Sequence, residues 1–244
     1  MKLFPNNQTI LEAVLKTEDH IASGKKISVS VSGGGGDSDI VVDMFERIGY
    51  TPGQVIYVWF DTGLEYDATK RHLRFLEEKY GIHIERHKAK KAVPTSCREY
   101  GQPFLSKRVS MYIERLQRHG FQWEDGSLED LSAKYHNCVS ALKWWCNAWG
   151  EKSRFNIEQA YGLKEFMMQN HPPKLSDKCC EYAKKNVGYE IEKVLQPELI
   201  VTGVRRAEGG VRATQYSSCY TPAGKHAAQF RPVFYFTDDD KKRV

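Results

Sequence analysis

The chain has 244 residues, of which 41% are hydrophobic and 27% are charged. This composition is typical of a globular protein with one large domain and excludes disordered and fibrous classes. A net charge of +5 suits an anionic small molecule as well as a nucleic acid. No apolar run approaches the roughly 18 residues of a membrane span, and the N-terminal segment lacks a signal-peptide pattern. We therefore expect a cytoplasmic protein that has no membrane contact.

Helix and strand patterns alternate along the first part of the chain and predict an open sheet of parallel strands. Helical spacing of apolar residues, or a β-rich run bounded by turn residues, defines each element. The expected elements are a helix over 8–22, a strand over 27–32, a helix from Asp37 that ends at Gly49, a strand over 55–60, a helix over 69–80, a short strand over 82–84 and a later strand over 199–202. This order predicts an α/β fold with a Rossmann-like open parallel sheet.

The residues between the strands expected over 82–84 and 199–202 have helical patterns. Helices are expected over 106–119, 131–149 and 157–169, and this stretch holds four of the five tryptophans. We therefore expect residues 1–244 to form a single α/β domain with a helical insertion at about 92–195.

A glycine-rich loop follows the strand over 27–32. Residues 32–38 read SGGGGDS, which lacks the lysine of a Walker loop and the register of a dinucleotide-binding GxGxxG motif. A glycine-rich turn between a strand and a helix N-terminus exposes backbone N–H groups and the positive end of the helix dipole. The loop therefore predicts a phosphate or sulfate site.

Two further segments follow strands and carry polar groups. Residues 60–66 read FDTGLEY, in which Asp61 could accept a hydrogen bond from a ribose or cap its own turn. Residues 203–212 read GVRRAEGGVR, in which Arg205 and Arg212 could grip a tetrahedral anion, since guanidinium groups bind oxyanions bidentately. A solvated basic turn is the alternative for this last segment.

These three segments together resemble a known family. Residues 32–38 resemble the pyrophosphate-binding SGGxDS motif of the adenine nucleotide alpha-hydrolase (PP-loop) superfamily, with one residue more. Residues 60–66 are similar to the DTGxxF/Y element of phosphoadenylyl-sulfate (PAPS) reductases, and residues 203–212 are similar to their GxRxxESxxR segment, with Gly209 in place of the serine. Residues 100–107 resemble the phage and bacterial PAPS-reductase-like branch. The resemblance implies an adenine nucleotide alpha-hydrolase-like fold and nucleotide contacts by Ser32, Gly33, Gly34, Gly35, Gly36, Asp37, Ser38, Asp61, Thr62, Gly63, Arg205, Glu208 and Arg212.

The cysteines suggest a metal site through the same resemblance. Cys179 and Cys180, followed by Lys184, resemble the CCxxRK element of reductases that carry an iron–sulfur cluster, in which each iron needs a thiolate. The downstream CxxC of that family does not occur, so Cys219 is the third candidate ligand, and Cys97, Cys138 and Cys146 are the reserves. Inert buried thiols are the alternative. The family's catalytic ECGxH tail is absent from the sequence, which makes Cys219 the candidate catalytic nucleophile, with Asp37 as the candidate catalytic carboxylate.

Three functions compete. The first is a PAPS-reductase-family enzyme that acts on an adenylylated sulfate, releases sulfite and takes electrons from a thiol-redox donor. The second is a PP-loop ATP pyrophosphatase or sulfurtransferase that uses Mg-ATP to adenylate a nucleic acid or a small molecule. The third is a catalytically degenerate nucleotide-binding module, whose tryptophan-rich insertion could contact a macromolecule. Each of these three functions is compatible with a homo-oligomer.

Overall fold

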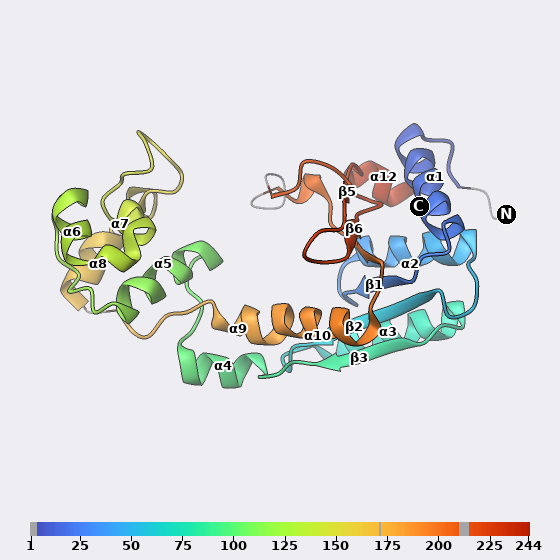
Figure 1. Cartoon of the computed structure of the whole chain (residues 1–244), viewed down its shortest axis with the longest axis horizontal. Helices are drawn as coiled ribbons and strands as arrows, with labels where there is room; N and C mark the ends of the chain where they lie inside the picture. Colours follow the sequence, from blue (N-terminus) through green and yellow to red (C-terminus); the bar gives the residue numbers. More distant parts are fainter. Residues whose placement is uncertain (1–3, 171, 210–214) are drawn as a thin grey trace. The chain divides into compact units, whose positions relative to one another are not determined.

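The computed structural model describes residues 4–170, 172–209 and 215–244. It divides into two compact units, which we call the sheet unit (residues 1–90 and 184–244) and the helical unit (residues 91–183). Figure 1 labels their elements. The sheet unit holds α1 (Gln8–Ala22), β1 (Ile27–Val31), α2 (Gly36–Ile48), β2 (Val55–Asp61), α3 (Asp67–Tyr80), β3 (Ile84–Lys88), α10 (Asn186–Leu195), β4 (Leu199–Thr202), a 3₁₀ turn η4 (Arg206–Glu208), β5 (Tyr220–Thr221), β6 (Ala228–Phe230) and α12 (Asp238–Arg243).

The six strands form one sheet in the order β3-β2-β1-β4-β6-β5. All neighbours are parallel except β5 and β6, which are antiparallel. The chain adds β2 and β3 on one side of β1 and then returns to place β4 on the other side. This reversal between β1 and β4 is a topological switch point, where open α/β sheets bind ligands at the carboxyl ends of their strands. The structure confirms the predicted open α/β fold.

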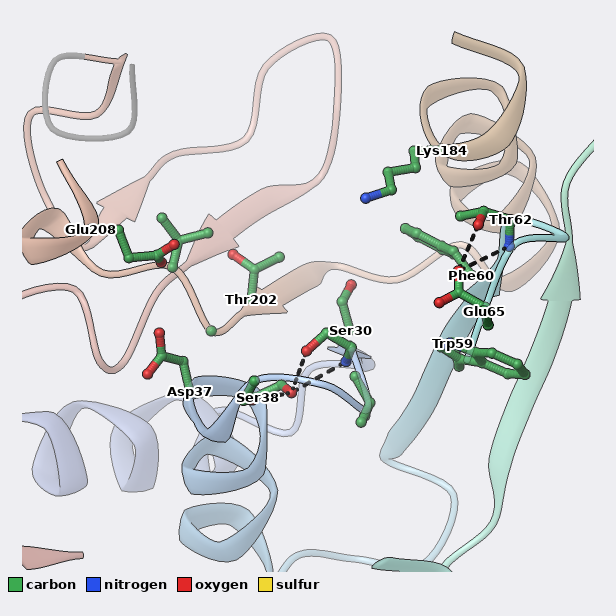
Figure 2. A pocket seen from close by; sticks show the side chains of 15 residues that line it. Ser30, Asp37, Ser38, Trp59, Phe60, Thr62, Glu65, Lys184, Thr202 and Glu208 are labelled. Carbon is green, nitrogen blue, oxygen red and sulfur yellow. Dashed lines mark hydrogen bonds between the residues drawn. The ribbon is translucent and has the colours of Figure 1, made fainter. Parts of the chain in front are cut away.

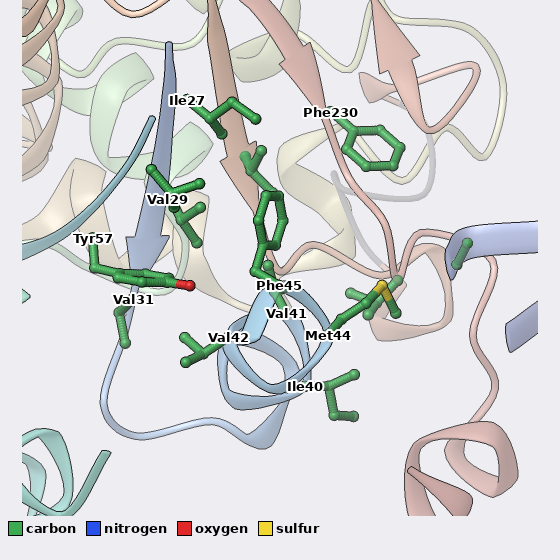
Figure 3. Packing of buried hydrophobic residues seen from close by; sticks show 14 of the residues in the cluster. Ile27, Val29, Val31, Ile40, Val41, Val42, Met44, Phe45, Tyr57 and Phe230 are labelled. Carbon is green, nitrogen blue, oxygen red and sulfur yellow. The ribbon is translucent and has the colours of Figure 1, made fainter. Parts of the chain in front are cut away.

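The core of the sheet unit is built from aliphatic strand residues and one face of α2. Val29 and Val31 of β1 and Val201 of β4 are buried, as expected of strands covered on both faces. On α2, Val41 and Phe45 recur at helical spacing and pack on the same cluster (Figure 3). This packing fixes the start of α2 at the end of β1.

The bounds of one strand and of one helix differ from the prediction. The third strand was expected over 82–84 but begins at Ile84 and runs to Lys88. It is an edge strand in which only Ile84 is buried, so its charged residues give no apolar run. The helix expected from Asp37 begins at Gly36, and its N-cap is Gly35.

The helical unit contains short helices around an aromatic core. Its elements are α4 (Val93–Tyr100), α5 (Lys107–Arg118), α6 (Leu128–Lys134), η1 (His136–Cys138), α7 (Val139–Trp145), η2 (Ile157–Gln159), α8 (Leu163–Asn170) and α9 (Lys178–Cys180), after which a π-helical turn, η3 (Glu181–Lys185), leads into α10. The single helix expected over 131–149 is therefore two helices and a 3₁₀ turn. Among the described residues, none of the helices combines the length and the apolar character that a membrane span needs.

Candidate functional site

The glycine-rich loop joins the end of β1 to the start of α2 at the switch point. Gly35, the N-cap of α2, has an extended backbone (φ −139°, ψ 126°) and contributes no side-chain cap. Asp37 and Ser38 lie in the first turn of the helix. No side-chain cap satisfies the first N–H groups of α2, and uncapped helix N-termini favour anions.

Two serines close the base of the loop. The hydroxyl groups of Ser32 and Ser38 are 2.9 Å apart, and the Ser38 hydroxyl also accepts a hydrogen bond of 3.2 Å from the Ser32 N–H group. Ser38 donates in turn to the Gly35 carbonyl oxygen at 3.2 Å. These bonds hold both ends of the loop together.

Asp37 lies between two cations. Its Oδ1 is 2.9 Å from Arg205 Nε and 2.9 Å from Lys241 Nζ, and Arg205 also contacts Asp238 at 2.8 Å. Burial by itself would raise the pKa of Asp37, but Lys241 and Arg205 outweigh it and hold that pKa below its ordinary value. Asp37 is therefore ionised at neutral pH, and its charge is already compensated.

Gly203, directly after β4, packs against the start of α2. A Cβ atom on Gly203 would lie 2.7 Å from Ser38 N and 2.8 Å from the carbonyl carbon of Asp37. Only a residue without a side chain allows these two backbones to approach so closely. The contact brings the segment after β4 to the glycine-rich loop.

A cavity of about 340 Å³ opens above this junction. It is lined by Ser30, Val31, Ser32, Gly35, Asp37, Ser38, Trp59, Phe60, Thr62, Glu65, Lys184, Thr202, Gly203, Val204 and Glu208. Figure 2 shows Lys184 extending from its helix toward the space between Thr202 and Thr62. Its ammonium group has no ion-pair partner within the described part of the chain, so it is available to an anion.

The turn after β2 forms another wall of the cavity. Thr62 donates a hydrogen bond of 2.6 Å from its hydroxyl group to Glu65 Oε1. Asp61 is not among the described lining residues, and its carboxylate pairs with Arg86 and accepts a 3.0 Å hydrogen bond from the Gly63 N–H group. Burial would raise the pKa of Asp61, but Arg86 and Gly63 lower it overall. Of the two roles expected for Asp61, the structure shows the ordering of its own turn.

The structure brings part of the predicted nucleotide-binding set together around the cavity: Ser32, Gly35, Asp37, Ser38, Thr62 and Glu208. Gly33, Gly34, Gly36 and Gly63 belong to the same two loops but are not among the described lining residues. Arg205 pairs with Asp37, is only 7% exposed and is not among the described lining residues. Glu208 accepts a hydrogen bond from the Arg205 N–H group at 3.1 Å and so orders the 3₁₀ turn. Arg212 lies outside the described residues.

Several residues that line the cavity are not in the predicted nucleotide-binding set. Ser30 and Thr202 are the last polar positions of β1 and β4, and their alternation with buried valines was the available signal. In the sequence, Lys184 stands out only as the lysine that follows Cys179 and Cys180, but in the structure it lines the cavity. Its distance of 146 residues along the chain from Ser38 left no local signal of this contact.

The three cysteines of the predicted metal site belong to different units, and their shared site stays a prediction. Cys179 and Cys180 lie in the helical unit, and Cys219 lies in the sheet unit, where it packs against the core. Residues 4–170, 172–209 and 215–244 contain no group of three or more His, Cys, Asp or Glu side chains that could hold a metal. The donor set does not fit a four-iron cluster, so we derive no chemistry through one. The catalytic role of Cys219 stays a prediction, because this cysteine is not among the described lining residues of the cavity.

The fold defines an open α/β protein with a cavity at its switch point. No family model matches the chain, and no curated protein matches it. One match among solved structures is the PAPS reductase from Candida auris, solved as a phosphate complex. That structure is 12% identical, with a TM-score of 0.48, and the alignment covers 97% of this chain and 77% of that chain. A match at this level carries no argument about the site, which rests on the residues described above.

Proposed function

We propose that the cavity at the switch point binds an adenine nucleotide through its phosphate or sulfate end, and that the chain is a PAPS-reductase-like enzyme that acts on an adenylylated sulfate. One observation carries this proposal. The SGGGGDS loop opens α2 directly beside Gly203, under a cavity into which Lys184 extends. The resemblance of the loop to the pyrophosphate-binding motif agrees with that position.

The chemistry of the cavity favours an anion. The first turn of α2 contributes N–H groups and the helix dipole, and Lys184 contributes a full positive charge on the opposite side. The loop itself has no lysine, so Lys184 takes over the part that a loop lysine plays in other phosphate sites. A volume of about 340 Å³ lies within the usual range for small-molecule sites.

The state of Asp37 favours a phosphosulfate over Mg-ATP. Magnesium is bound by carboxylate oxygens and by substrate phosphates. Asp37 is the carboxylate of the loop, and Arg205 and Lys241 already occupy its Oδ1. A nucleotide that binds without a metal therefore suits this site better than one that brings a magnesium ion.

The apolar and hydroxyl-bearing residues that line the cavity suit a nucleoside. Phe60 and Trp59, at the end of β2, supply apolar surface, and Ser30, Thr62 and Thr202 supply hydroxyl groups. A mostly apolar wall with a few placed polar groups is typical of sites that orient a base and its sugar.

The reaction that the resemblance implies begins with attack by a thiolate on the sulfur of the nucleotide. The bond from sulfur to the bridging oxygen breaks, adenosine 3′,5′-bisphosphate leaves, and the sulfonate group stays on the cysteine. A second thiol then attacks that cysteine sulfur, sulfite leaves with the electron pair, and a disulfide forms. Cys219 remains our candidate for the first thiolate, and an external thiol donor supplies the second.

Titration calorimetry tests the proposal with PAPS, adenosine 3′,5′-bisphosphate, and ATP with and without magnesium. We expect Lys184→Ala to weaken the binding of PAPS about tenfold or more, because one charge-assisted contact is worth roughly 1.5–3 kcal/mol. Lys185→Ala is the matched control, since Lys185 is the adjacent exposed lysine and is not a described lining residue. Absence of nucleotide binding to the unmodified protein, or equal effects of both substitutions, would contradict the proposal. Tight binding of ATP only with magnesium would favour the pyrophosphatase alternative.

A further inference from the structure

The helical unit contains a pair of thiols that the proposed nucleotide site does not use. We propose that Cys97 and Cys179 form a redox-active dithiol that exchanges with small-molecule disulfides and closes to an intrachain disulfide bond. Nothing in this inference depends on nucleotide binding.

The backbone holds the segments that carry these cysteines side by side. The Gln102 N–H group donates to the Lys174 carbonyl oxygen at 3.2 Å, and the Ser176 N–H group donates to the Gln102 carbonyl oxygen at 3.0 Å. A Cβ atom on Gly101 would lie 2.3 Å from the Lys174 oxygen, so only glycine allows this approach. The end of α4 and the residues before α9 are therefore locked together.

Matching positions on the two helical segments then face each other. The rings of Tyr100 and Tyr182 stack with their centroids 5.2 Å apart and their planes 15° apart. Lys91 Nζ lies 4.7 Å from the first ring centroid and 5.3 Å from the second, and it donates to the Tyr100 hydroxyl group at 2.8 Å. Tyr100 follows Cys97 by three residues within α4, the spacing that places two side chains on the same face of a helix. Tyr182 follows Cys179 by the same number of residues, across the junction of α9 and η3.

Cys97 therefore lies one helical turn from the ring of Tyr100, on a helix that packs against α9, the element that carries Cys179. Burial raises the pKa of the Cys179 thiol, and the Cys97 thiol beside it raises that pKa further. Both are half-buried rather than enclosed, so a small disulfide can reach them. A disulfide bond needs two cysteines on closely packed backbone segments, and α4 and α9 provide such a pair of segments.

Cys180 takes no part in this pair. Its Sγ accepts a hydrogen bond from Lys107 Nζ at 3.4 Å, so the side chain is engaged with α5. A bond between the adjacent Cys179 and Cys180 would also be strained. A π-helical turn follows directly at Glu181–Lys185, and such turns occur frequently at functional sites.

The exchange is balanced as a two-electron reaction. One sulfur of the pair, as a thiolate, attacks one sulfur of a disulfide RSSR, and the first RS⁻ leaves. The second sulfur loses its proton to solvent and attacks the mixed disulfide, and the second RS⁻ leaves. Cys97 and Cys179 are oxidised to one disulfide, and RSSR is reduced to two thiols.

The test is a titration of the full chain, purified under reducing conditions, with glutathione disulfide, followed by thiol counting and peptide mapping under non-reducing conditions. We expect the number of reactive thiols to fall from six to four in the monomer, and dithiothreitol to restore all six. Trypsin should release peptide 92–98 linked to peptide 179–184. Cys180→Ser is the matched control and should form the same linkage, whereas Cys97→Ser and Cys179→Ser should lose it.

Three outcomes would overturn the inference: six thiols that survive the titration, a bond between Cys179 and Cys180, or a linkage that disappears in Cys180→Ser. The mapping of the unmodified chain and of Cys180→Ser decides the question even if Cys97→Ser fails to fold. Calorimetry with nucleotide on the same samples separates this inference from the proposed function, because either result can fail alone.

Discussion

The two units of the molecule use their large side chains differently. In the sheet unit, the core combines aliphatic residues with aromatic ones such as Phe45 and Phe230, and polar residues gather where β1 and β4 end. In the helical unit, Phe121, Trp123, Tyr135, Trp144 and Trp145 pack in edge-on and tilted pairs with centroids 5.0–6.3 Å apart. Three of that unit's four tryptophans are thus buried in its core.

This difference shows which sequence signals point to a ligand. Richness in tryptophan suggested a macromolecule-binding face, but Trp123, Trp144 and Trp145 are used in packing, and Trp149 is the exposed exception at 38%. The polar strand ends of the sheet unit looked unremarkable in sequence, yet parallel strands bring them to one edge. In this chain, the order of the strands in the sheet therefore locates the cavity better than the tryptophan content does.

The largest expected effect comes from the core of the helical unit. Trp145 is fully buried and donates from Nε1 to the Glu124 carbonyl oxygen at 2.9 Å. We expect Trp145→Ala to lower the free energy of unfolding of this unit by about 3–5 kcal/mol, because it leaves a large cavity and removes a buried hydrogen bond. Urea unfolding followed by circular dichroism measures this loss.

Trp149→Ala is the control, and it should change the free energy of unfolding by about 0.5 kcal/mol or less, since its ring is partly exposed. Nucleotide affinity should be the same in both variants, because the cavity is lined by the sheet unit alone. Equal destabilisation by both substitutions would contradict the contrast between the two units.

A smaller effect on stability is expected at the switch point, where two glycines differ in their surroundings. Gly203→Val should destabilise the sheet unit by roughly 1–3 kcal/mol or more, since its Cβ would meet the backbone of Ser38 and Asp37 within 2.9 Å. Gly35→Val is the matched variant, because Gly35 has a backbone that valine adopts readily and its Cβ would meet nothing closer than 3.9 Å. It should keep the melting temperature and lose nucleotide affinity, because its side chain enters the cavity. Calorimetry and thermal unfolding on both variants separate packing from binding, and unchanged affinity in Gly35→Val would argue against the loop as the anion site.

The sequence was sufficient for elements that carry a local pattern. The strand over 199–202 and the helix over 8–22 match their predictions, because apolar spacing and the Asn7 cap define them. The β5–β6 hairpin and α12 were missed, since two- and three-residue strands have no periodicity and α12 has no apolar face. Neither the Lys241–Asp37 pair nor the position of Lys184 has a local signal, because tertiary structure alone brings those residues to the loop.

The smallest expected effect concerns the charges around Asp37 and depends on pH. Arg205 and Lys241 lower the pKa of Asp37 despite its burial, so the ionised form is bound more strongly in the folded chain than in the unfolded chain. Its contribution to stability is therefore complete above the ordinary value of 3.8 and is lost as the pH falls through the lowered folded value.

We expect Asp37→Asn to reduce the free energy of unfolding by about 1–2 kcal/mol at pH 7, a modest amount because Lys241 is partly exposed. The difference from the unmodified protein should stay constant from about pH 5 to pH 8 and shrink below about pH 4. Asp238→Asn, at an exposed carboxylate that also contacts Arg205, is the control and should reduce the free energy of unfolding at pH 7 by less. Urea unfolding at a series of pH values measures both, and a difference for Asp37→Asn that persists undiminished at acid pH would show that its ion pairs do not stabilise the loop.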